Sequence, residues 1–214
     1  SFQDAGTAGG ERYGGRFGSI LDLGHNPSGR FRGMKSDSWE GGHRIPFLVR
    51  WPGVIPAGSV TDALTCDLDL YATLADVAGV TLSAGDAGAP PPSRSLMPLL
   101  RGGEPVRTSL VAQSGNGILC YIRDGWKLIA GSGSGGSLNP YGQADLLPEY
   151  DTVSGRWRNV QLYNLESDPE ERYDRAALHP QRVARMMEAL AREVRRGGTA
   201  ADWQQVAWTS RFGE

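Results

Sequence analysis

The feature that most limits the possible folds is a seven-residue apolar run, IPFLVRW at Ile45–Trp51, which is closed by Pro52-Gly53. A short apolar run bounded by turn residues is typical of a strand buried in a parallel or mixed sheet. Residues 1–45 before it are rich in glycine and show little apolar periodicity. They are expected to form a long loop, and long loops in compact domains commonly carry function.

A helix is expected after this strand, over about residues 68–78, with Thr65 and Asp67 as capping residues and Gly79 as its end. Its apolar stripe consists of Leu70, Leu74, Val77 and Ala78. A strand followed by a helix predicts an α/β layer.

The second half of the chain has the pattern of short antiparallel strands: SLVAQ, ILCYIRD, WKLIAG and VQLYNL. Asp124-Gly125 predicts a hairpin turn, and Gly131–Gln143 is flexible by composition. A final helix is expected from Pro180 to Arg196, with one apolar stripe. A composition shift near Glu104-Pro105 predicts two domains, 1–105 and 106–214, so the fold class is α/β with an α+β carboxy-terminal part.

The totals exclude several classes of protein. A net charge of -2 does not favour a nucleic-acid partner or a polybasic membrane anchor. No apolar segment is long enough to predict a membrane span. The two cysteines, Cys66 and Cys120, are interpreted as buried thiols, although a single disulfide stays open.

Lys35 lies among glycines and near Arg30, Arg32 and Arg44. Glycines let a backbone approach a ligand closely, and a compact ammonium suits the oxyanions of a sulfate or phosphate. From the residues alone, the segment is either an anion-binding loop or a plain solvated turn.

A resemblance to a known protein family favours the anion-binding loop over the plain solvated turn. RGMKSDSWEGGHRIPFLVRWPG, at Arg32–Gly53, resembles the sulfatase family segment in which a lysine follows R-G and precedes E-G-G-x-R-x-P. CDLDLYATLADVAGV, SRSLMPLLRG, DGWKLI and LYNLESDPEE follow in the family's order. The resemblance implies the end of a sulfatase-like α/β domain of the alkaline phosphatase superfamily, followed by a small antiparallel sheet packed with a carboxy-terminal helix.

The resemblance also implies roles for single residues. Lys35 would be the catalytic lysine that contacts the sulfate ester and neutralises charge on the leaving oxygen. Glu40 and Arg44 would pair or bind loop backbone and so position Lys35. His43 and His25 are candidate substrate contacts, with plain surface exposure as the alternative for each. No metal ligand is expected in this chain.

The family's C-x-P-S-R motif, whose cysteine is oxidised to formylglycine, is absent, and so are the acidic clusters that bind its calcium. We therefore expect a carboxy-terminal portion of a sulfuric ester hydrolase, inactive alone, whose formylglycine and calcium ligands lie in a missing amino-terminal part. The alternatives are a phosphoesterase of the same superfamily and a non-catalytic module that binds an anionic glycan. An extracytoplasmic location, periplasmic, secreted or lysosomal, follows only from the resemblance.

Overall fold

The computed structural model describes residues 26–82, 93–136 and 146–196. The chain forms two compact units: one joins the residues up to Ile45 with those from Val111 onward, and the other is Pro46–Leu110. The predicted domain boundary at 105/106 stays a prediction. His25 and most of the predicted amino-terminal loop lie outside the described residues.

The first unit is built on a four-stranded sheet in the order β1-β2-β3-β6. Its strands are β1 Ser109–Gln113, β2 Leu119–Arg123, β3 Trp126–Ile129 and β6 Gln161–Asn164. The pairs β2/β3 and β3/β6 are antiparallel. Asp124 and Gly125 join β2 to β3 with φ of 51° and 71°, the left-handed conformation that two-residue hairpins favour. The predicted antiparallel strands and hairpin are confirmed.

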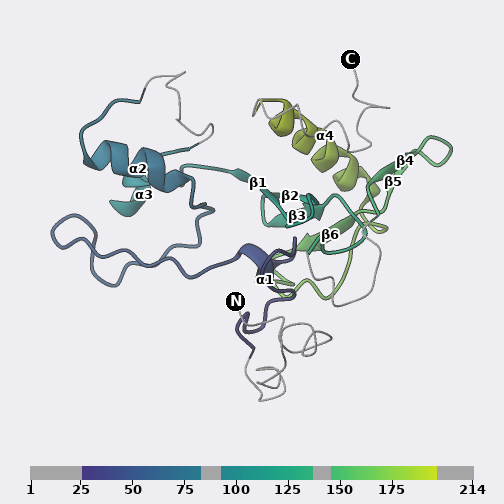
Figure 1. Cartoon of the computed structure of the whole chain (residues 1–214), viewed down its shortest axis with the longest axis horizontal. Helices are drawn as coiled ribbons and strands as arrows, with labels where there is room; N and C mark the ends of the chain where they lie inside the picture. The colour runs from purple at the N-terminus through teal and green to yellow at the C-terminus, as the bar shows by residue number, and fades with distance from the viewer. Residues whose placement is uncertain (1–25, 83–92, 137–145, 197–214) are drawn as a thin grey trace. The chain divides into compact units, whose positions relative to one another are not determined.

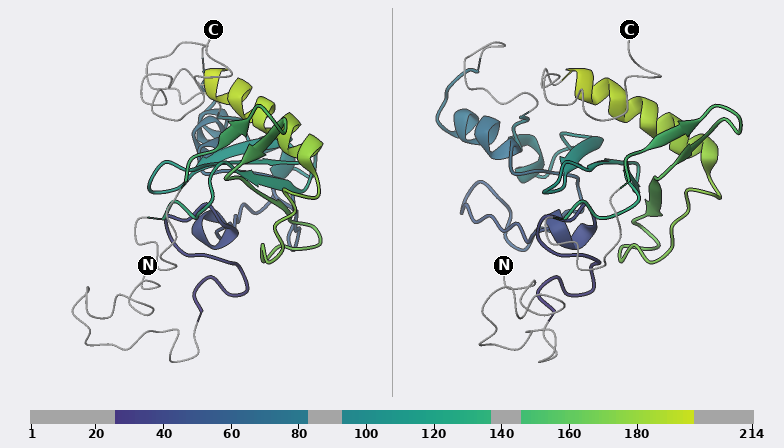
Figure 2. Two further views of the ribbon diagram at one scale, coloured as in Figure 1. Left: turned by 90° about the vertical axis from the view of Figure 1, so that its right-hand side faces the viewer. Right: turned by 45° about the vertical axis from the view of Figure 1, so that its right-hand side comes forward.

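One face of this sheet is covered by α4, Pro180–Arg196, as Figures 1 and 2 show. Val183, Met187 and Leu190 of the helix are buried against Leu128 and Leu162 of the sheet. Each buried aliphatic side chain contributes about 1.5–3 kcal/mol. The predicted helix and its apolar stripe are confirmed.

The other face of the sheet carries a second core of Ile118, Cys120, Ile129 and Tyr163, closed by Trp39. Successive residues of a strand point to opposite faces, which is why Leu128 meets α4 while Ile129 meets Trp39. Trp39 precedes α1, Glu40–His43, and the views show α1 on the side of the sheet away from α4.

The glycine-serine run at Gly131–Gly136 is mostly buried, so the prediction of a flexible segment is wrong for these residues. The Gln161 amide donates to the carbonyls of Gly131 and Gly133, at 2.9 and 3.0 Å. The carbonyl of Ser134 accepts from the Ser38 amide at 2.7 Å. Small residues are needed here because the backbone itself is packed. Residues 137–143 lie outside the described chain.

A second sheet of two antiparallel strands was not predicted. It pairs β4, Glu149–Asp151, with β5, Arg156–Arg158, and is stabilised by an edge-to-face contact of Tyr150 and Trp157. Three-residue strands leave too little pattern for recognition from sequence.

The second unit, Pro46–Leu110, contains α2, Asp69–Val77, and α3, Met97–Leu100. The predicted helix and its end at Gly79 are confirmed, but the N-cap residue is Leu68, which makes no side-chain cap, and Asp67 accepts only from the Leu68 amide at 3.0 Å. Asp69, at the first helical position, instead accepts from the backbone amides of Cys66 and Arg94. It also forms a buried two-pronged ion pair with Arg107.

The predicted strand at Ile45–Trp51 does not form, and that prediction is wrong. The segment has no strand assignment, and Ile45, Phe47 and Leu48 are 71%, 48% and 90% exposed. A strand needs a neighbour to satisfy its backbone amides and carbonyls, and none of the described segments pairs with this one. The apolar side chains of α2 are exposed as well, with Leu74 at 64%.

Candidate active-site loop

Residues 32–44, here called the Lys35 loop, form a closed loop with Lys35 exposed in its turn. The Gly41 amide donates to the Arg32 carbonyl at 2.7 Å and so joins the two ends of the loop. Ser36, which follows Lys35, has φ of 80°, a conformation that non-glycine residues rarely adopt. Its carbonyl accepts from the Gly115 amide at 2.8 Å, which ties the turn to the chain between β1 and β2.

The two glycines of E-G-G are required by space. A Cβ at Gly41 would lie 2.4 Å from the carbonyl oxygen of Gly33, and one at Gly42 would lie 2.1 Å from that of Asp37. Both obstacles are backbone atoms of the same loop. The motif therefore allows the chain to fold back closely on itself beneath Lys35.

Gly42→Ala is expected to destabilise the first unit by about 1–3 kcal/mol, because an added methyl group must displace packed backbone. Calorimetry should show a lower Tm. Gly53→Ala is the comparison: nothing lies within 4 Å of an added Cβ there, so only the left-handed φ of 80° opposes alanine, and we expect a smaller loss. If both substitutions lower the Tm equally, the close packing of Gly42 is not the cause.

Arg32 anchors the first end of the loop. Its guanidinium lies 3.8 Å from the centre of the Trp39 ring and donates to the Tyr163 hydroxyl and the Glu171 carbonyl, both at 3.1 Å. Trp39 in turn donates from Nε1 to Gln161 at 3.1 Å. Stacking and hydrogen bonds together hold the loop on the sheet.

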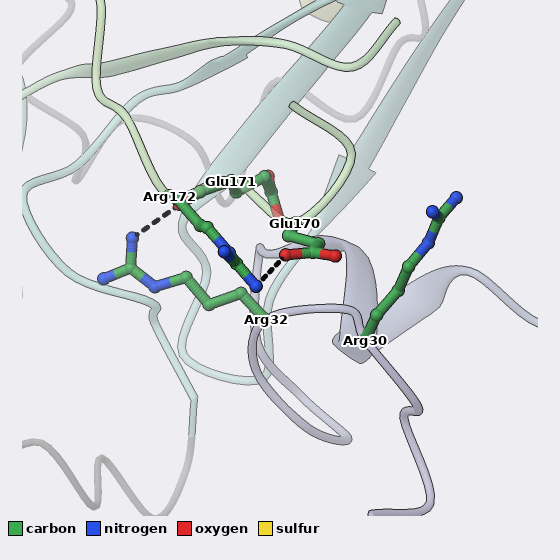
Figure 3. Close-up of a pocket in the computed structure, with 5 residues that line it drawn as sticks. All are labelled: Arg30, Arg32, Glu170, Glu171 and Arg172. Carbon is green, nitrogen blue, oxygen red and sulfur yellow. Dashed lines mark hydrogen bonds and ion pairs between the residues drawn. The ribbon is translucent and has the colours of Figure 1, made fainter. Parts of the chain in front are cut away.

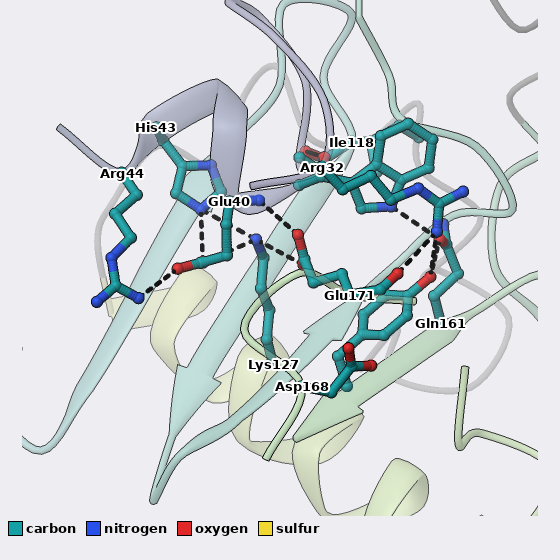
Figure 4. Close-up of polar contacts among 12 residues, drawn as sticks. Arg32, Glu40, His43, Arg44, Ile118, Lys127, Gln161, Asp168 and Glu171 are labelled. Carbon is teal, nitrogen blue, oxygen red and sulfur yellow. Dashed lines mark hydrogen bonds and ion pairs between the residues drawn. The ribbon is translucent and has the colours of Figure 1, made fainter. Parts of the chain in front are cut away.

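Lys127 of β3 anchors the other end (Figure 4). Its side chain is fully buried, and Nζ lies 3.1 Å from Glu40 Oε1, 3.0 Å from Glu171 Oε1 and 3.1 Å from His43 Nε2. The Glu40 amide also donates to Glu171 Oε2 at 2.5 Å. Sequence reasoning missed this lysine as a site residue. The available signal was a lysine in the otherwise apolar strand WKLI, facing the same side as Ile129.

The pKa values of the two carboxyl groups in this cluster, Glu40 and Glu171, are shifted in opposite directions. Burial opposes ionisation of Glu40, but the interactions with His43 and the charge of Lys127 outweigh it and lower the pKa to about 2. Burial raises the pKa of Glu171, and Lys127 offsets this only in part. Glu40 is therefore the firmly ionised partner of the lysine.

A pocket of about 420 Å³ lies beside the loop and is lined entirely by charged residues, as Figure 3 shows. They are Arg30, Arg32, Glu170, Glu171 and Arg172. Arg172 is paired with Glu170, while Glu171 directs its carboxylate to Lys127.

The structure brings three of the predicted site residues together. Glu40 and Arg44 form an ion pair at 3.1 Å, and His43 joins Lys127 beside them. Lys35 is exposed in the turn of the same loop. His25 lies outside the described residues.

The described residues do not fit a calcium site. They contain no cluster of three metal-binding side chains, and the carboxylates of Glu40 and Glu171 face Lys127. Cys66 and Cys120 are free thiols, and burial raises the pKa of Cys120 to about 11. A thiol of that kind is a poor nucleophile at neutral pH.

Several known proteins are similar to this chain. The Sulfatase family model matches residues 11–80. An N-acetylgalactosamine-6-O-sulfatase of Bacteroides thetaiotaomicron is 32% identical over 167 residues, which cover 78% of this chain and 30% of that protein. An arylsulfatase of Hemicentrotus pulcherrimus is 54% identical over 52 residues, 24% of this chain and 9% of its own length.

Solved structures are also similar to this chain in fold. One from Bacteroides thetaiotaomicron, described in connection with the metabolism of multiple glycosaminoglycans, has a TM-score of 0.63 and 30% identity over 81% of this chain and 34% of that one. A sulfatase from Pseudoalteromonas sp. shares the fold with a TM-score of 0.56 and 21% identity, over 78% and 33% of the two chains.

The chain belongs to the sulfatase family, within the alkaline phosphatase superfamily. The family resemblance and the mixed α and β fold are thereby confirmed. The chain spans 30% or less of the length of the curated relatives described above. Among the described residues, no helix is long and apolar enough to cross a membrane.

Proposed function

We propose that this chain is part of a sulfuric ester hydrolase and contributes the lysine that contacts the sulfate, Lys35. The observation that carries the proposal is an exposed lysine in a closed turn whose two ends are bonded to a folded sheet. A rigidly held cation stabilises negative charge better than a mobile one, because little reorganisation is needed in the transition state.

In the proposed reaction, water cleaves the sulfate ester to an alcohol and sulfate. The Lys35 ammonium binds a sulfate oxygen and neutralises charge that develops on the leaving oxygen as the ester bond breaks. Glu40 and Arg44 position the loop, and His43 is tied to them through Lys127. Formylglycine would supply the nucleophile of the family's reaction, and calcium would supply positive charge at the sulfate. We place both in the amino-terminal part of the enzyme.

The exposed apolar segment Ile45–Trp51 supports the proposal that formylglycine and calcium belong to another part of the enzyme. Leu48 and Val49 are 90% and 42% exposed, and contiguous apolar surface of this kind marks an interaction site. We propose that the amino-terminal part of the enzyme covers this apolar surface. An extracytoplasmic location of the whole enzyme is part of the same proposal and rests on the family resemblance.

The test uses the polypeptide that carries this chain together with a C-x-P-S-R segment. Hydrolysis of 4-nitrophenyl sulfate and 4-nitrophenyl phosphate is compared at equal concentrations. We expect turnover of the sulfate. A preference for the phosphate would point to a phosphoesterase, and binding of a sulfated sugar without turnover of either ester would point to a non-catalytic module; both outcomes would overturn the proposal.

A further inference from the structure

The sequence contains two lysines, Lys35 and Lys127, and the other members of its 22 Lys+Arg are arginines. The first is exposed and the second is fully buried, on the face of the sheet that carries the Lys35 loop. An ammonium directs three protons in different directions, whereas a guanidinium is a planar fork. Lysine at position 127 therefore suits a site with several acceptors around one point.

Three groups surround the ammonium: Glu40 accepts a hydrogen bond, Glu171 forms an ion pair, and His43 is in hydrogen-bond contact. Glu40 Oε1, His43 Nε2 and Glu171 Oε1 all lie within 3.1 Å of Lys127 Nζ. Two of them belong to α1 and the third to the segment before α4. Lys127 thus connects the Lys35 loop to a residue 131 positions away from Glu40. Glu171 has φ of 53°, a costly conformation for this residue type that the surrounding contacts must support.

The hydrogen-bonding chemistry of Lys127 Nζ and His43 Nε2 determines which ring nitrogen of His43 carries a proton. An ammonium has three donors and no acceptor, so a ring nitrogen in hydrogen-bond contact with it must accept. Nε2 of His43 therefore carries no proton, and in a neutral ring the proton is on Nδ1. Nε2 is 3.6 Å from Glu40 Oε1, beyond hydrogen-bond distance, so the contact with Lys127 decides.

The charges around the cluster agree with a neutral imidazole. Lys127 and Arg44 are the two cations, and Glu40 and Glu171 are the two carboxyl groups. A protonated His43 would add a third cation 3.1 Å from the buried ammonium. At that distance like charges in a protein interior repel strongly.

We propose that Lys127 is the positioning residue of the Lys35 loop, and that it acts by donating a hydrogen bond each to Glu40 and His43 and by pairing its charge with Glu171, which fixes His43 as the neutral Nδ1–H tautomer. The inference rests on the proposed function only in giving the loop a reaction to serve. It assigns His43 to holding the loop through Nε2, which leaves that atom unable to read a substrate.

The first measurement is the 15N spectrum of the full chain labelled in its three histidines, with the His43 signals assigned by their loss in His43→Gln. We expect the pattern of an Nδ1–H tautomer, with Nε2 shifted by an accepted hydrogen bond. An Nε2–H tautomer would overturn the proposal, since two donors cannot share the contact.

The second measurement compares two substitutions of His43, whose side chain is 23% exposed and whose replacement should leave the sheet folded. Gln offers an amide oxygen to Lys127, whereas Leu offers no acceptor. The Glu40 amide, which donates to Glu171, reports by hydrogen exchange whether the loop stays bound. His43→Leu should speed this exchange about tenfold or more, because a buried ammonium proton loses its partner, and His43→Gln should stay within about threefold of wild type.

Equal exchange in the two variants would overturn the positioning role. Neither measurement involves a substrate, so each result is independent of ester hydrolysis. A wild-type protein that hydrolyses no sulfate ester would remove the proposed function while leaving the Lys127 assignment intact.

Discussion

Lys35→Ala is expected to lower kcat/KM for an aryl sulfate by about 100- to 1,000-fold in the enzyme that carries this chain, the loss typical of removing one transition-state charge stabiliser. The loss should fall mainly on kcat, because the charge on the leaving oxygen develops as the ester bond breaks. Lys35 is exposed, so the Tm should stay close to that of the wild type. Steady-state kinetics and calorimetry of the same preparations check both statements.

Two controls separate the role of Lys35 from a general loss of positive charge. Arg101→Ala removes an exposed cation at the end of α3 and should leave kcat/KM unchanged. Within this chain, acetic anhydride should modify Lys35 but not the buried Lys127, and sulfate should slow the modification. Wild-type kcat/KM in Lys35→Ala, or labelling of Lys35 at the same rate with and without sulfate, would contradict the assigned role.

Asp69→Ala should reduce the stability of the second unit by about 3–5 kcal/mol, since it removes the carboxylate that pairs with the buried Arg107. It also removes the acceptor of the Cys66 and Arg94 amides, at 3.1 and 3.0 Å. Hydrogen exchange of the α2 amides measures this loss locally.

The matched control is Asp76→Ala, an exposed acid on the same helix, for which we expect a change within about 0.5 kcal/mol. Burial opposes ionisation of Asp69, but Arg107 lowers its pKa below the ordinary value. The ion pair therefore stabilises the unit above the pKa of an unfolded aspartate and weakens as the pH falls through the lowered value. A loss below about 1 kcal/mol in Asp69→Ala at neutral pH would show that the pair contributes little.

The elements that could be predicted from sequence are those stabilised by local pattern. The stripe of Val183, Met187 and Leu190 and the Asp124-Gly125 turn are readable because the same residues that pack or turn also repeat at the period of the element. The Lys35 segment was found through its motif, and the structure supplies the reason for part of that motif in the crowded Gly41 and Gly42.

The failures have physical causes. IPFLVRW has the composition of a strand, but strand formation depends on a neighbour that the run does not encode. The glycine-serine run is buried because Gln161, 28 and 30 residues later, bonds its carbonyls. Lys127 was missed because a buried lysine is explained only by its partners Glu40 and Glu171, and no local pattern connects them.

The attachment of the Lys35 loop also determines when it can form during synthesis. Its partners follow far behind it: Lys127 comes 87 residues after Glu40, Gln161 122 after Trp39, and Glu171 131 after Glu40. At roughly 5–20 residues per second, the ribosome needs roughly 7 to 26 s to supply the last of these. The loop is therefore expected to close late, so a nascent chain should acquire the folded geometry around Lys35 only after the sheet and the segment before α4 have left the ribosome.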